Sequence, residues 1–117
     1  MFSEDNFEQR MRFGRLFDIY GGLLTEKQQQ CLGLYFYDDL SLSEVGDELG
    51  VSRQAVHDLL KRVEQTLEKY ESKLHLLAKS EADRERLRLA INILDGKTAR
   101  EQEARKILLE LSGEGGK

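Results

Sequence analysis

The sequence predicts an all-α protein built around a helix-turn-helix. The chain of 117 residues contains no proline, and it is rich in Leu, Glu, Lys, Arg and Gln, which favour helices. Apolar residues recur at helical spacing, whereas no segment has the pattern of a strand. The segment 41–62 adds the start, turn and second-start signals of a helix-turn-helix at the spacings that this motif requires.

Two helices are expected before that motif. An apolar face predicts a first helix that ends near Gly21 and Gly22, and its members are Phe13, Leu16, Phe17, Ile19, Tyr20, Leu23 and Leu24. Thr25 is expected to cap a second helix, with Gln28 as its partner in a capping box. The inward side of this second helix is expected to carry Cys31, Leu32, Leu34, Tyr35 and Phe36.

The helix-turn-helix follows from two caps and one glycine. Ser41 with Glu44 forms a second capping-box pattern, which predicts the start of the third helix. Gly50 suits a left-handed turn position, and Ser52 is expected to cap the next helix. That helix is expected to turn four apolar side chains inward, namely Val56, Leu59, Leu60 and Val63.

Two further residues of the motif are expected to serve packing. Gly46 lies where the second helix of the motif would cross the first, so we interpret it as a small residue that lets the backbones approach closely. Val51 is expected to fill the gap between the two helices.

The second helix of the motif is expected to be long. Its apolar residues continue at heptad spacing through Val56, Leu60, Val63, Leu67, Tyr70, Leu74 and Leu77. A helix from Arg53 to Lys79 would be about 40 Å long, so we expect its distal half to need a C-terminal hairpin or a second subunit as a packing partner. Intramolecular or antiparallel packing is favoured over a parallel zipper, and a homodimer stays open.

The last third predicts a helical hairpin. Ser80 with Asp83 is expected to cap one helix that carries Leu87, Ala90, Ile91 and Leu94, and residues 95–97 form a tight break. Thr98 with Glu101 is expected to cap the last helix, which presents Ala104, Ile107, Leu108 and Leu111. The expected divisions are a helix-turn-helix domain with the long helix at 1–79, the hairpin at 80–111 and a flexible tail at 112–117.

The segment LLTEKQQQCLGLYFYDDLSLSEVGDELGVSRQAVHDLLKRVEQTLEKYESKL resembles the region-four helix-turn-helix of sigma factors. Its LT-x-KQ and GVSRQAV-x-D elements are closest to the small YlxM-type proteins of bacteria, over about residues 13–77. Such proteins are typically encoded beside protein components of the signal recognition particle. The resemblance therefore implies a regulatory or accessory role in that protein-targeting pathway, and it places the DNA-contacting positions at Ser52, Arg53, Gln54, His57, Lys61 and Arg62.

Two functions follow from these residues. In the first, Arg53 and Gln54 at the start of the recognition helix read base edges of duplex DNA, and Lys61 and Arg62 meet phosphates. The net charge of −4 then predicts weak binding, or binding that needs a dimer or partner, because phosphate neutralisation calls for a basic face. In the second, the fold is an interaction module for a protein or RNA of the signal recognition particle.

The sequence carries no pattern for catalysis, so we expect a protein that is not an enzyme and needs no cofactor. Cys31 lies among core residues, and His57 and His75 are 18 residues apart, too far along one helix to share a metal. No apolar stretch approaches the roughly 20 residues that span a bilayer. The N-terminus lacks a signal-peptide pattern, so a cytoplasmic protein without membrane insertion is expected.

Overall fold

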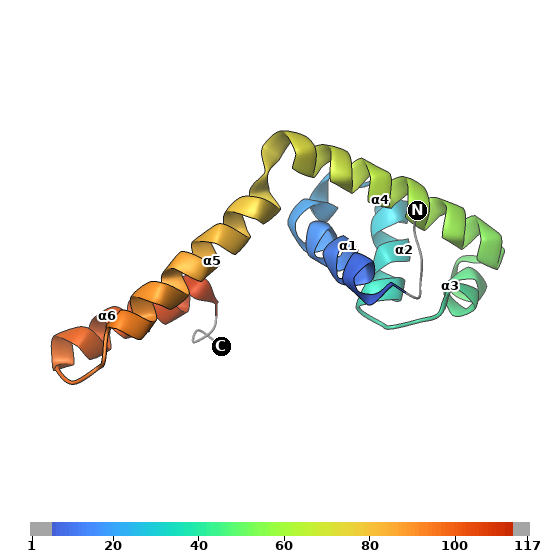
Figure 1. Ribbon diagram of the computed structural model, residues 1–117. Helices are drawn as coiled ribbons and strands as arrows, with labels where there is room; N and C mark the ends of the chain where they lie inside the picture. Colours follow the sequence, from blue (N-terminus) through green and yellow to red (C-terminus); the bar gives the residue numbers. More distant parts are fainter. Residues whose placement is uncertain (1–5, 114–117) are drawn as a thin grey trace. The chain divides into compact units, whose positions relative to one another are not determined.

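A computed structural model describes residues 6–113, and these residues are helical throughout apart from short connections (Figure 1). The elements are α1 Phe7–Tyr20, the 3-10 turn η1 Gly21–Leu23, α2 Glu26–Phe36, α3 Leu42–Leu49, α4 Arg53–Leu74, α5 Leu76–Ile93 and α6 Ala99–Ser112. The all-α class is confirmed. The chain divides into two compact units, one ending at Leu77 and the other beginning at Ala78. Residues 114–117 of the expected tail lie outside the described residues.

The first unit packs α1, α2 and α3 against α4, which runs along its whole length (Figure 1). All four helices contribute to one apolar core, and its most buried side chains are Phe13, Leu16, Tyr20, Cys31, Leu32, Tyr35, Leu42, Val45, Val56, Leu60, Val63 and Leu67. Leu34, Phe36, Leu59 and Tyr70 are partly buried against it. Leu23, which was expected on the apolar face of the first helix, is 60% exposed in η1, and the other residues expected on the apolar faces of α1 and α2 are confirmed as core residues.

The predicted caps of the first unit are present. Thr25 with Gln28, and Ser41 with Glu44, each form a complete capping box in which side chain and backbone bond reciprocally. The backbone N–H of Ser41 donates to the carboxylate of Glu44, and this bond lowers the pKa of that carboxyl. The start of each helix is thus fixed by residues three apart in sequence.

The turn of the motif is closed by backbone rather than by an apolar side chain. Gly50 has φ +72°, as a left-handed C-cap requires, and an ideal Cβ on Gly46 would lie 2.6 Å from the carbonyl oxygen of Val51. The packing role of Gly46 is confirmed. The prediction for Val51 was wrong: its side chain is 38% exposed, because the Val51 backbone occupies the space above Gly46.

The long helix ends earlier than predicted. A continuous helix to Lys79 was wrong, since α4 ends at Leu74 and His75 adopts a left-handed conformation with φ +56°. The break is stabilised by Glu71, whose carboxylate accepts the backbone N–H of Leu77 at 2.9 Å in the first turn of α5.

Because α5 starts at Leu76, the prediction that Ser80 caps a helix was also wrong. Ser80 lies inside α5, and its expected partner Asp83 instead pairs with Lys79 at 2.7 Å between the carboxylate and the ammonium group. This i, i+4 pair is a surface feature of the helix and contributes little to stability.

The distal half of α4 packs within its own unit. Leu67 is fully buried, and the ring of Tyr70 lies 5.9 Å from the ring of Tyr20 on α1. Leu67 and Tyr70 therefore have their packing partner on α1, without the C-terminal hairpin or the second subunit that was expected to cover this half. Leu74, the last seam residue of α4, is 54% exposed.

The second unit is the expected pair of helices, α5 and α6. Thr98 caps α6 by accepting the backbone N–H of Glu101, as predicted, and Gly96 turns the chain with φ +73°. Ile91 is buried, whereas Ile107 and Leu111, two of the apolar residues that the last helix was expected to present, are 50% and 69% exposed. Polar groups take part of the inner side of α6 instead, since Arg105 donates to the carbonyl oxygen of Ile91 at 2.6 Å.

Candidate nucleic-acid interface

The start of α4 is the candidate site because three local features present it to solvent. Gly50 ends α3 in a left-handed turn, so the chain can reverse direction over only three residues. Ser52 then accepts the backbone N–H of Ala55 at 3.0 Å and starts α4. Val56 and Leu60 anchor the helix in the core, which leaves the opposite side of its first turns exposed.

The six predicted site residues do not form one row. Ser52, Arg53 and Gln54 are exposed at the beginning of α4, as predicted for residues that enter a groove. His57 and Lys61 are four residues apart and half-buried, so they form a row along one flank of the helix. The sixth, Arg62, is exposed and lies outside that row.

An outward row of α4 carries Gln54, Asp58 and Arg62 at four-residue spacing. The side-chain amide of Gln54 donates to the carboxylate of Asp58 at 3.0 Å, and this carboxylate lies 3.6 Å from Nδ1 of His57. Asp58 is therefore part of this candidate surface although the site prediction left it out, and the i, i+4 spacing of Gln and Asp is a recognisable signal. The Asp58 carboxylate accepts one N–H of the Gln54 amide, which leaves the other N–H as a donor and the amide oxygen as an acceptor.

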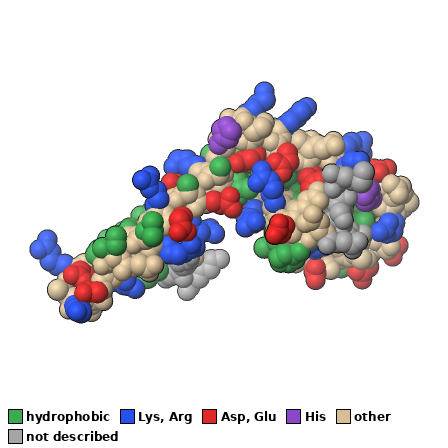
Figure 2. Space-filling model, viewed as in Figure 1, with side chains coloured by type: hydrophobic (Ala, Val, Ile, Leu, Met, Phe, Trp, Pro, Cys, Tyr) green, Lys and Arg blue, Asp and Glu red, His purple; other side chains and the backbone are tan. Residues whose placement is uncertain are grey.

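Two cations of the site are available to bind an external anion. Within the described range 6–113, Lys61 and Arg62 form no ion pair. Two other cations of the first unit are paired, Arg12 with Glu68 at 2.7 Å and Arg10 with Asp39 at 3.3 Å. Positive charge in this part of the molecule is therefore unbalanced at Lys61 and Arg62, although charges of both signs are interspersed over the face seen in Figure 2.

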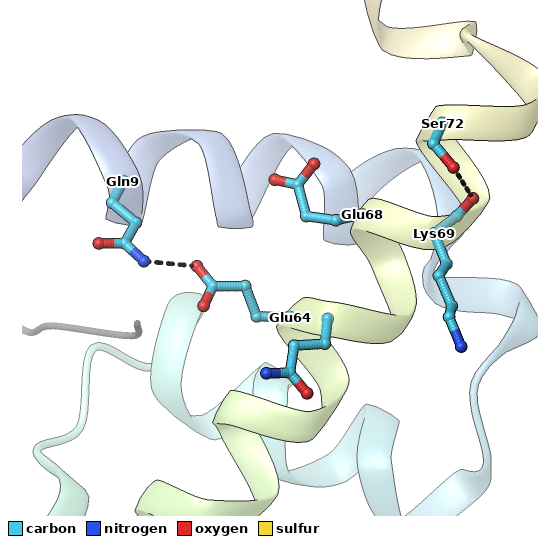
Figure 3. A pocket seen from close by; sticks show the side chains of 6 residues that line it. Gln9, Glu64, Glu68, Lys69 and Ser72 are labelled. Atoms are coloured by element: carbon cyan, nitrogen blue, oxygen red, sulfur yellow. Dashed lines mark hydrogen bonds between the residues drawn. The ribbon is translucent and has the colours of Figure 1, made fainter.

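The α1 flank of α4 carries acidic groups instead. A shallow groove of about 450 Å³ is lined there by Gln9, Glu64, Gln65, Glu68, Lys69 and Ser72 (Figure 3). The side-chain amide of Gln9 points to Glu64 and donates to its carboxylate at 3.1 Å, and Glu68 is held by Arg12. Glu64 forms no ion pair within residues 6–113, and its carboxylate disfavours the approach of a phosphate backbone along this flank.

Other chemistry has little support in the described residues. Burial raises the pKa of the Cys31 thiol to about 11, so the thiol is protonated at neutral pH and is a poor nucleophile. Among residues 6–113, no group of three or more His, Cys, Asp or Glu side chains is placed to hold a metal ion. No helix in the described part of the chain is both long and apolar enough to cross a bilayer.

Comparison with known proteins gives one family. A family described as "UPF0122: Putative helix-turn-helix protein, YlxM / p13 like" matches residues 7–109. A UPF0122 protein of Desulforamulus reducens is 53% identical over 79 residues, which cover 68% of each chain. Another, from Halalkalibacterium halodurans, is 46% identical over 95 residues, which cover 81% of this chain and 87% of the relative. The family match over residues 7–109 includes both the helix-turn-helix and most of the second unit.

Proposed function

This chain belongs to the YlxM / p13-like helix-turn-helix family, and from that premise we propose that it binds duplex DNA through the first turns of α4 as a regulatory protein. The observation that carries the proposal is the exposure of Arg53 and Gln54 at the start of a helix whose opposite side is locked into the core. Both side chains can hydrogen-bond base edges in a major groove. The function is binding, without a catalytic step.

Lys61 and Arg62 supply the phosphate contacts in this proposal. Both lie about two to two and a half helical turns beyond Arg53 and Gln54 and are without ion pairs in residues 6–113. If Arg53 also meets a phosphate, three contacts give a slope of about −2.7 in log affinity against log salt. Binding is weak at physiological salt, because the whole chain carries a net charge of −4. A homodimer would double the slope for each complex.

The experiment is a titration of duplex DNA at low salt, with a site first selected from random sequences. Replacing Arg53 and Gln54 together by Ala is expected to reduce discrimination between the selected site and a scrambled duplex by roughly fivefold or more. The matched control is Lys73→Ala, which removes an exposed cation from the last turn of α4. No duplex binding by the unmodified protein, or discrimination that survives the double replacement, would contradict the proposal.

A second candidate is an accessory role in the protein-targeting pathway, through a protein or RNA of the signal recognition particle. It is favoured by the apolar surface of the second unit. Among the described residues of that unit, Ile91 is the only buried hydrophobic residue, and several large apolar side chains are exposed. Ile93 and Leu111 are 81% and 69% exposed. Direct titration with purified particle protein and RNA distinguishes the two roles, because Ile93→Lys should abolish the protein contact and leave DNA binding unchanged.

A further inference from the structure

A pocket lies between the beginning of α2 and the middle of α4, and its lining residues are far apart in the sequence. It has a volume of about 400 Å³ and is lined by Thr25, Lys27 and Gln28 at the beginning of α2 and by Leu59, Arg62 and Thr66 of α4. Its lining includes two cations and no carboxylate. In a chain with more acidic than basic residues, this composition makes the pocket a local positive region.

The polar neighbours in the pocket already have partners, whereas the cations do not. Thr25 and Gln28 bond each other reciprocally in the capping box, and the hydroxyl of Thr66 donates to the backbone carbonyl of Arg62 at 3.0 Å. Within residues 6–113, neither Lys27 nor Arg62 forms an ion pair. The capping box uses Thr25 and Gln28 side-chain oxygens as acceptors, so their side-chain hydrogens add donors to those of the ammonium and guanidinium groups. A pocket that offers donors and two positive charges selects an anion.

We propose that this pocket binds a backbone phosphate of the duplex whose groove receives α4, with Lys27 and Arg62 as the contacting cations. The inference rests on the proposed function. Arg62 connects the pocket to the reading surface, because it also lies on the outward row with Gln54. The opposite flank carries the carboxylate of Glu64, while Glu68 there is paired with Arg12 and Lys69 is the one cation of the groove lining. The α2 flank, with two cations and no carboxylate in its pocket, is therefore the more positive side of α4, and one DNA strand is held along α2.

The anion is a phosphate of bound DNA rather than a free ion. The pocket is open and part of its wall is the side chain of Leu59, so two surface cations give little affinity for phosphate alone. A phosphate that belongs to a docked duplex is presented at high effective concentration and needs only these two contacts. Lys27 thereby becomes a DNA-contacting residue on a helix outside the helix-turn-helix.

The test measures binding of a short random-sequence duplex to the full chain across a range of salt concentrations. Lys27→Gln is expected to make the slope shallower by up to about 0.9, since Arg62 still contacts the shared phosphate, so that the loss of affinity between 50 and 200 mM salt becomes up to about 3.5-fold smaller. Lys27→Arg should restore the slope. The control Lys73→Gln makes the same change in net charge at the far end of α4 and should leave the slope unchanged.

Each outcome decides between the proposals. A slope that is equal for Lys27→Gln and Lys73→Gln, while replacement of Arg53 and Gln54 still reduces discrimination, overturns the pocket and leaves the proposed function intact. No duplex binding by the unmodified protein overturns both. A loss of affinity for duplex RNA but not for duplex DNA in Lys27→Gln would assign the pocket to RNA and overturn the inference as stated. Lys27 is exposed, so unchanged melting is expected and confirms that folding is not the cause.

Discussion

Tyr20 donates its phenolic hydrogen to the carboxylate of Glu71, at 2.6 Å between the oxygens, across 51 residues of sequence. Both residues are buried, with Tyr20 2% and Glu71 6% exposed. The same carboxylate oxygen accepts the N–H of Leu77, and the Tyr20 hydroxyl accepts the N–H of Leu76 at 3.2 Å. Burial and the bond to Glu71 raise the pKa of Tyr20. One buried pair thus joins α1, α4 and the start of α5.

Removing Glu71 should destabilise the first unit. Glu71→Ala leaves the Tyr20 hydroxyl and the Leu77 amide without their acceptor, and each unsatisfied group costs about 1–3 kcal/mol. Denaturant unfolding measures the loss. Glu68→Ala is the control, because Glu68 lies on the same helix and its partner Arg12 is 46% exposed. Equal losses for the two variants would show that the buried network contributes nothing.

Alanine should have opposite effects at two glycines inside helices. At Gly46 the added methyl group meets the Val51 carbonyl at 2.6 Å, so Gly46→Ala is expected to cost about 1–3 kcal/mol. At Gly33 nothing lies within 4 Å of the added methyl group, and helix propensity favours alanine by roughly 1 kcal/mol. Thermal melting of both variants checks the signs. Stabilisation by Gly46→Ala would mean that α3 and the turn do not approach as described.

Truncation of the apolar seam should depend on position along α4. Leu67→Ala removes a fully buried side chain and is expected to cost about 2–5 kcal/mol. Leu74→Ala, on the same helix and 54% exposed, is expected to cost less than about 1 kcal/mol. Equilibrium unfolding gives both values, and light scattering should report an unchanged mass for Leu67→Ala because its contacts are within the chain. A large cost at Leu74 would instead indicate packing that involves another molecule.

Cys31 should resist thiol reagents until the protein unfolds. Its side chain is fully buried and burial raises its pKa to about 11, so the thiolate is scarce at pH 7–8. The unfolded thiol ionises first as pH rises, so stability contributed by the neutral thiol is present below about pH 9 and is lost towards pH 11. Labelling with and without denaturant measures the protection. Rapid labelling of the native protein at pH 7 would contradict the burial.

The parts of the fold that sequence predicted are those set by residues close together in the chain. Thr25, Ser41 and Ser52 each cap a helix through a partner three residues on, and Gly50 ends α3 by its own backbone conformation. The break at His75 could not be predicted in this way. After this break, the backbone N–H groups of Leu76 and Leu77 in the first turn of α5 are accepted by Tyr20 and Glu71. An apolar heptad pattern gives no reason to expect a buried carboxylate on α4.

The candidate site was predicted as a set of residues but not as a surface. Sequence spacing identified Arg53, Gln54 and Arg62, which are exposed on α4. It did not indicate that the Asp58 carboxylate accepts a hydrogen bond from the Gln54 amide, because that bond depends on the rotamers that the two side chains adopt. It also could not bring Lys27 beside Arg62, because that proximity arises only when α2 packs against α4.

The pairing of Tyr20 with Glu71 also bears on how the chain folds while it is being made. Tyr20 leaves the ribosome 51 residues ahead of its partner, which at ordinary rates of synthesis is about 3–10 s. During this interval Phe13 and Phe17 of α1 can meet Phe36 at the end of α2, but α1 still lacks its contacts with α4, including that of Tyr20 with Tyr70. The nascent chain therefore exposes an apolar surface of α1 for seconds, and the core of the first unit is complete only once α4 has been synthesised.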